Sequence, residues 1–139
     1  MNRLLLRKRE VRLVGSVLAG VTALLLSACA ISPEIQAKMD EFERTIPTCS
    51  DATACQEKWA AARSWTVANS SFGIRGNSDT RIFATNTIIS QSGIGVVVNR
   101  VQTSDGFQIV VDMECFSAYS CPGIWDSKID FNRTLNNVR

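Results

Sequence analysis

Two pairs of cysteines with the same spacing constrain the fold of this 139-residue chain more than any other feature. Cys49 and Cys55 have five residues between them, and so do Cys115 and Cys121. In an exported chain, an even number of cysteines indicates disulfides, and the shared spacing favours the local pairing among the three that are possible. Each bond would close a loop of about seven residues, to which the chain-entropy model assigns roughly 2.4 kcal/mol.

The alternatives for these four cysteines are a zinc site and a redox dithiol. Structural zinc sites favour closer Cys-x2-4-Cys pairs, a catalytic dithiol is more often Cys-x2-Cys, and exported thiols are normally oxidised. The chain contains no histidine, which excludes Ser-His, Cys-His and His-rich metal chemistry. We therefore expect two disulfides, and neither a metal nor another cofactor.

The beginning of the chain has the anatomy of a secretory signal. Residues 3–12 form a region with five basic side chains, residues 13–26 form an apolar region, and the small residues Ser27 and Ala28 follow. A helix made of the apolar stretch would cover roughly 21 Å, which is less than the ~30 Å hydrocarbon core of a bilayer. We therefore expect a cleaved signal peptide over residues 1–28 rather than a permanent membrane span.

The residues at the end of the apolar stretch are Leu26, Ser27, Ala28 and Cys29. They resemble the lipobox of bacterial lipoprotein precursors, in which a leucine and two small residues precede an invariable cysteine. The resemblance implies that Cys29 is the mature N-terminus and carries acyl chains, and two or more chains anchor a protein stably to a membrane. Two alternatives are open. Ala28-Cys29-Ala30 also fits the pattern of ordinary signal cleavage, which would release a soluble protein, and the segment could stay uncleaved.

The residue after Cys29 and the charge of the mature chain bear on where the protein acts. In proteobacterial lipoproteins an aspartate at this position resembles an inner-membrane retention signal, and here the residue is Ala30. The resemblance thus implies the outer membrane, facing the periplasm.

Five of the 15 basic residues and one of the 13 acidic residues precede Ala28, which leaves 10 basic and 12 acidic residues in the mature chain. That balance gives no electrostatic footprint for nucleic acid.

Residues 29–48 are expected to form a tether or an amphipathic helix. Ser32-Pro33-Glu34 is a helix start, and Pro47 ends the segment. One apolar stripe runs along it, made of Ile35, Met39, Phe42 and Ile46. The helix could pack on the domain, lie on the membrane or dock into the groove of a partner.

Residues 49–139 are expected to form a small disulfide-bonded domain that begins with a helix. Ser50-Asp51 opens this helix, which passes through Cys55 and reaches Ala68. Its apolar face contains Trp59, Ala62, Trp65 and Thr66. The two tryptophans are expected to be core residues rather than ligand-stacking residues.

From Phe72 onward the pattern predicts β-structure. Residues 76–79 are a turn between a short strand around Ile74 and a longer strand over residues 81–89. Gly93-Ile94-Gly95 is read as a break before a strand over residues 96–103. Ser104-Asp105-Gly106 then predicts a hairpin turn, with residues 107–115 as the returning strand.

A terminal helix is expected after Cys121-Pro122-Gly123. Its apolar residues are Trp125, Ile129, Phe131, Leu135 and Val138. Together these elements predict an α+β two-layer sandwich, with an antiparallel sheet of about four strands, an N-terminal and a C-terminal helix, and two disulfides.

Asp112 and Glu114 are the candidate catalytic pair. They are two residues apart on a predicted strand, so both side chains emerge on one face about 7 Å apart, as two glycosidase carboxylates do. Acids that alternate with Val111 and Met113 are also typical of the solvated face of an amphipathic strand, and this second interpretation is favoured.

Three functional hypotheses follow. The leading one is a non-enzymatic envelope accessory protein that engages a protein partner, by β-augmentation if the 81–89 strand lies at a sheet edge. The second is a small-ligand or glycan-binding module, which requires an enclosed apolar pocket between sheet and helices. The third is a peptidoglycan hydrolase that uses Asp112 and Glu114. The general outline also resembles small proteobacterial lipoproteins, which adds no function.

Overall fold

A computed structural model describes residues 31–86 and 91–138. The expected signal peptide, Cys29 and residues 87–89 of the strand predicted over residues 81–89 lie outside the described residues. Within the described part this strand ends at Ala84, so residues 85 and 86 correct the prediction. Within the described ranges, no helix is long and apolar enough to cross a membrane. The described residues from Glu34 onward form one compact unit.

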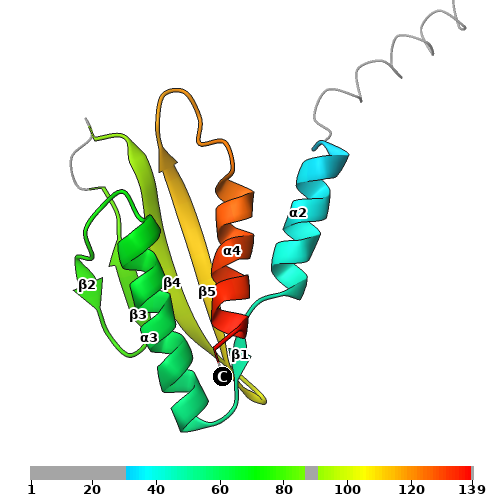
Figure 1. Cartoon of the computed structure of the whole chain (residues 1–139), viewed down its shortest axis with the longest axis vertical. Helices are drawn as coiled ribbons and strands as arrows, with labels where there is room; N and C mark the ends of the chain where they lie inside the picture. Colours follow the sequence, from blue (N-terminus) through cyan, green and yellow to red (C-terminus); the bar gives the residue numbers. More distant parts are fainter. Residues whose placement is uncertain (1–30, 87–90, 139) are drawn as a thin grey trace, which may run out of the picture. The chain divides into compact units, whose positions relative to one another are not determined.

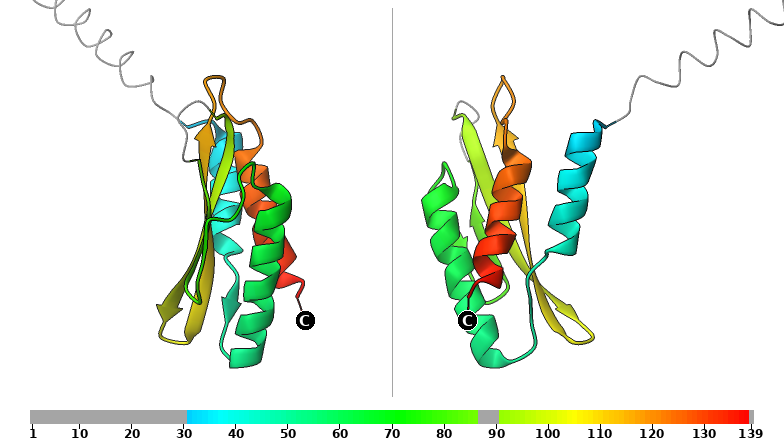
Figure 2. Two further views of the ribbon diagram at one scale, coloured as in Figure 1. Left: turned by 90° about the vertical axis from the view of Figure 1, so that its left-hand side faces the viewer. Right: turned by 45° about the vertical axis from the view of Figure 1, so that its right-hand side comes forward.

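The described elements form a five-stranded sheet with helices on one face. In chain order they are α2 (Pro33–Arg44), β1 (Thr48–Cys49), α3 (Ala52–Asn69), β2 (Gly76–Asn77), β3 (Arg81–Ala84), β4 (Gly93–Thr103), β5 (Gly106–Phe116) and α4 (Ile124–Asn136). The sheet is antiparallel with the order β1-β5-β4-β3-β2. The α3 and α4 helices lie on the same face of it (Figures 1 and 2). The predicted α+β two-layer sandwich is confirmed, with one strand more than the four expected.

The β4–β5 hairpin is the centre of the sheet and matches its prediction. Thr103 pairs with Gly106 across the two-residue turn Ser104-Asp105, and the pairing continues to Gly93 and Phe116. Alternate residues of the hairpin face the helices and are buried, namely Val96, Val98, Ile109, Val111 and Met113. They pack against Ala62, Trp65, Phe131 and Leu135 of the two helices.

The two tryptophans of α3 have different environments. Trp65 is 6% exposed, and its ring meets Phe131 edge to face at 5.2 Å. Trp59 is only partly buried and packs at the border of the core. The expectation of a core position is therefore confirmed for Trp65, whereas Trp59 keeps part of its surface accessible.

Both disulfides have the predicted local pairing. Cys49–Cys55 joins β1 to the first turn of α3, where Asp51 caps the helix by accepting a hydrogen bond from the Ala54 N–H at 2.8 Å. Cys115–Cys121 joins the end of β5 to the loop before α4. The bonds thus fix one end of each helix that covers the sheet.

Two glycine positions differ from their prediction. Gly93-Ile94-Gly95 is the start of β4 rather than a break, because these residues pair with Glu114 to Phe116 of β5. A Cβ at Gly95 would lie 2.8 Å from the Phe116 ring. Gly76 belongs to β2 rather than to the turn, and the Phe83 ring lies where its side chain would be. Both glycines allow an aromatic ring to lie against the backbone of a neighbouring strand. The short strand that the sequence predicted around Ile74 is found at residues 76–77 instead.

The α2 helix packs on α4, which is one of the arrangements expected for its apolar stripe. Phe42 meets Trp125 edge to face at 6.0 Å, and Phe42 also packs against the hydrophobic core. The other stripe residues, Ile35, Met39 and Ile46, are half-buried.

Candidate functional site

An open pocket of about 470 Å³ lies between α3 and the β2–β3 turn. We call it the α3 groove. It is lined by Gln56, Trp59, Ala60, Arg63, Asn77, Ser78, Asp79 and Arg100. Six of these eight residues are polar or charged, and the volume is in the range of small-ligand sites.

The walls of the α3 groove are held together by specific contacts. The four residues from α3 are spaced i, i+3, i+4 and i+7, so they share one helix face. The Trp59 indole Nε1 donates to the Ser78 carbonyl oxygen at 3.1 Å, which ties this face to the turn. The turn itself is closed by Ser78 Oγ, which accepts from the Arg81 N–H at 3.1 Å. Contacts within the protein therefore hold both walls in place.

Arg100 is the unusual residue of the α3 groove. It follows Val96 and Val98 on the face of β4 that packs against the helices. Its guanidinium carbon lies 4.1 Å from the centroid of the Phe107 ring, and its Nε is buried without an acceptor among the described residues. An unpaired buried donor costs about 1–3 kcal/mol. A loss of folding free energy at a single residue is expected where that residue serves function rather than stability.

The charge of the α3 groove is not balanced internally. Within residues 31–86 and 91–138, no carboxylate lies within 4.0 Å of a guanidinium nitrogen of Arg63 or Arg100. Asp79 is the one carboxylate among the lining residues. The lining therefore carries one net positive charge, and two guanidinium groups are available to an anion.

Asp112 and Glu114, the candidate catalytic pair, do not line the α3 groove. Both are exposed, on the sheet face opposite α3 and α4. The Asp112 carboxylate accepts from Lys128 Nζ of α4 at 3.1 Å and from the Met113 N–H at 2.9 Å. This arrangement favours the interpretation as a solvated strand face with a surface ion pair.

The strand expected to offer a docking edge is internal. β3 pairs with β2 on one side and with β4 on the other, so the condition for β-augmentation at this strand is not met. Beyond its pairing with β1, the outer side of β5 is an edge. The Ile109 N–H points to this side and donates to the Pro47 carbonyl oxygen. By strand alternation, the Met113 N–H points to the same side. The Asp112 carboxylate accepts a hydrogen bond from the Met113 N–H, so this donor is not available to another strand. A charged side chain at a sheet edge also discourages pairing with another strand.

The segment closed by Cys115–Cys121 presents one aromatic side chain to solvent. We call it the Tyr119 loop, and it comprises residues 115–121. The Tyr119 side chain is 92% exposed, and Ser120 adopts a left-handed φ of 72°. At the base of the loop, Phe116 meets Phe72 edge to face at 5.6 Å. The loop is therefore a constrained platform for an exposed tyrosine.

Sequence reasoning missed Arg63, Arg100 and Tyr119. Arg100 had a signal, because strand alternation places it on the same face as the buried Val96 and Val98. Arg63 and Tyr119 had none, since each is an ordinary polar or aromatic residue until its neighbours are known. No family model, curated protein or solved structure matches this chain.

Proposed function

We propose that this chain is the precursor of a lipid-anchored envelope lipoprotein, whose folded unit is a non-enzymatic module that binds a protein partner. The cysteine pairing carries the proposal. Cys49–Cys55 and Cys115–Cys121 account for four of the five cysteines. The fifth is Cys29, at the lipobox position. Disulfides persist in oxidising compartments, which agrees with export, and Ala30 favours the outer membrane facing the periplasm.

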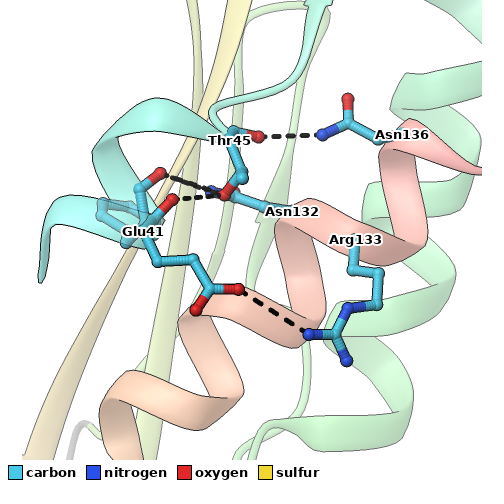
Figure 3. Close-up of polar contacts among 6 residues, drawn as sticks. Glu41, Thr45, Asn132, Arg133 and Asn136 are labelled. Atoms are coloured by element: carbon cyan, nitrogen blue, oxygen red, sulfur yellow. Dashed lines mark hydrogen bonds and ion pairs between the residues drawn. The ribbon is translucent and has the colours of Figure 1, made fainter. Parts of the chain in front are cut away.

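The α2 helix, which follows the proposed anchor, is fixed to the folded unit. Figure 3 shows the contacts at its C-terminal end. Asn132 Nδ2 of α4 donates to the Phe42 carbonyl oxygen at 2.9 Å and to Thr45 Oγ1 at 3.1 Å. Asn136 Nδ2 donates to the Thr45 carbonyl oxygen at 2.9 Å. These amides supply further donors to acceptors at the C-terminal end of the helix, where the regular i to i+4 hydrogen bonds end.

The chain between the proposed anchor and α2 is short. Pro33, the first residue of α2, is four residues after Cys29, a span of at most about 14 Å when fully extended. An acylated Cys29 would therefore hold the module near the membrane surface and limit its reorientation. A partner would have to lie in, or pass close to, the same membrane.

The Tyr119 loop supports a protein as the partner. Tyrosine is enriched among the few residues that dominate binding energy at protein interfaces. The disulfide restricts this loop before binding, so less conformational entropy is lost when it docks. The loop is thus suited to act as a rigid contact for an envelope protein.

The anchor is tested by growing cells with an alkyne-bearing fatty acid and measuring the label on the purified protein. The wild-type chain should be labelled, and the Cys29→Ala variant should carry no label. A matched control is the Cys49→Ala/Cys55→Ala double variant, which removes two cysteines away from the lipobox and should be labelled like the wild type. Label on Cys29→Ala, or none on the wild type, would refute the anchor.

The partner is tested by photo-crosslinking in intact cells. A photoreactive residue in place of Tyr119 should give a reproducible adduct with one envelope protein. The same residue in place of Val67, which is 67% exposed on α3, is the matched control and should not give it. Recovery of monomer alone from position 119, or the same adducts from both positions, would count against this module.

A second candidate function is small-ligand or glycan binding, and the α3 groove favours it. The sequence-based hypothesis required an enclosed apolar pocket. The groove is instead open, and most of its lining is polar. It therefore suits a hydrophilic ligand.

A further inference from the structure

We infer that the α3 groove binds a sugar that carries a single carboxylate, of the hexuronate class. In this assignment, Arg100 and Arg63 bind the carboxylate, and the sugar ring lies against Trp59. The inference rests on the second candidate function, ligand binding in the α3 groove, and depends on neither the proposed anchor nor the protein partner.

Arg100 is prepared to bind an anion. Its guanidinium is stacked at 4.1 Å from the Phe107 centroid, so its orientation is largely fixed before a ligand arrives. Its Nε is buried and has no acceptor among the described residues, and the residue lines the groove. A planar guanidinium matches a carboxylate through two parallel hydrogen bonds.

Arg63 brings a second guanidinium to the groove from the opposite wall. It lies on α3, at the end of the helix face that also carries Gln56, Trp59 and Ala60. Neither it nor Arg100 has a carboxylate within ion-pair distance among residues 31–86 and 91–138. With Asp79 also in the lining, an anion with one negative charge would balance the net charge of the groove.

The other lining residues limit the charge of the ligand and give it hydroxyl groups. Asp79 would repel a polyanion, so one negative charge fits the groove best. Gln56 and Asn77 offer amide donors and acceptors, and Asp79 offers further acceptors, which together suit several hydroxyls. Trp59 adds an aromatic surface whose orientation is fixed by its bond to the Ser78 carbonyl oxygen.

The test is an NMR titration of the isotope-labelled full chain, purified in a non-ionic detergent. The probes are sodium D-glucuronate, neutral D-glucose and inorganic phosphate. Glucuronate should shift the Trp59 indole N–H and the Arg100 Nε–H resonances saturably, with a dissociation constant on the order of millimolar, and should bind about tenfold more tightly than glucose or phosphate.

Variants locate the binding site. Arg63→Gln changes an exposed residue and leaves the core intact, and it should weaken glucuronate binding about tenfold. Arg100→Gln should weaken it at least as much, whereas Arg75→Gln, an exposed residue outside the groove, should leave it unchanged.

Four results would overturn the inference. The first is the absence of saturable shifts at up to about 50 mM glucuronate. The second is equal binding of glucose, which would remove the role of the carboxylate. The third is equal or tighter binding of phosphate, which would remove the role of the sugar. The fourth is unchanged binding by Arg63→Gln.

Discussion

The side-chain amide of Asn132 donates from α4 to the carbonyl oxygen of Phe42 on α2, across 2.9 Å. The two residues are 90 positions apart in the chain. The same amide donates to Thr45 Oγ1, and Asn132 is completely buried. One polar side chain thus connects the helix that follows the proposed anchor to the helix that covers the sheet.

Replacement of Asn132 by alanine should lower the free energy of unfolding by about 1–3 kcal/mol, because two hydrogen bonds are lost, one to the Phe42 carbonyl oxygen and one to the Thr45 hydroxyl. Urea denaturation with intact disulfides measures this. Asn137→Ala, at an exposed position just after α4, is the control and should change the value by less than about 0.5 kcal/mol. Equal effects of both substitutions would contradict the link.

Lys38 makes the contact between α2 and α4 sensitive to alkaline pH. Its Nζ lies 3.0 Å from Asp126 Oδ2, and this hydrogen bond is the largest cause that raises the pKa of Lys38 above its usual 10.5. Because the pKa of Lys38 is higher in the folded state than in the unfolded state, its charged form stabilises the fold fully at pH values below the unfolded-state pKa. This stabilisation is lost as the pH rises through the folded-state pKa. Lys38→Met should therefore be slightly less stable than the wild type at neutral pH. Denaturation at a series of pH values should show the difference vanish above the raised pKa, and a constant difference would be inconsistent with this account.

Phe131 is completely buried between the helices and the sheet. Phe131→Ala should lower the free energy of unfolding by about 3–5 kcal/mol, because it leaves a cavity beside Trp65. Val67→Ala, at a position that is 67% exposed, should cost less than about 0.5 kcal/mol. Thermal or chemical denaturation compares the two, and a loss below about 1 kcal/mol for Phe131→Ala would show that the core is packed differently.

Gly76 and Phe83 should be energetically coupled. A Cβ at position 76 would overlap the Phe83 ring, so Gly76→Ala should destabilise the fold by about 1–3 kcal/mol. In a Phe83→Ala background the same change should cost less, since the ring is absent. A double-mutant cycle measures the coupling, expected at about 0.5–3 kcal/mol, and strictly additive effects would refute it.

Removal of the second disulfide should affect both stability and the proposed partner contact. Cys115→Ser/Cys121→Ser should lower the free energy of unfolding by roughly 2.4 kcal/mol and reduce the crosslinking yield from position 119. The Cys49→Ser/Cys55→Ser variant loses a bond of the same separation and should lose similar stability while it keeps the crosslink. Equal loss of crosslinking in both variants would assign the effect to stability alone.

Local sequence signals predicted most of the fold. The Asp51 cap predicted the start of α3, Ser104-Asp105 predicted the β4–β5 turn, and the equal cysteine spacing predicted both disulfides. The two-residue strand β1 was not predicted, because two residues have no periodicity and depend on β5 for their pairing. The start of β4 was missed for a related reason. The structural role of Gly95 is to leave room for the Phe116 ring, which is 21 positions away in the chain.

The candidate sites were less predictable than the fold. The α3 groove combines residues from α3, the β2–β3 turn and β4, and no local motif connects these segments. Asp112 and Glu114 had a local pattern, and the structure places both on an exposed sheet face, as the favoured sequence interpretation expected, and outside the groove. Spacing along one element predicts which residues share a face, but it does not predict what lies opposite them.

The short separation within each cysteine pair also affects how an exported chain can acquire its covalent bonds. Both partners are six positions apart, so they come within reach of each other as soon as a short stretch has left the export channel. Closure of so short a loop takes well under a microsecond, far less than oxidation. Loop closure therefore does not limit either native bond, and for a chain exported as proposed the rate of oxidation would set how quickly each pair is joined.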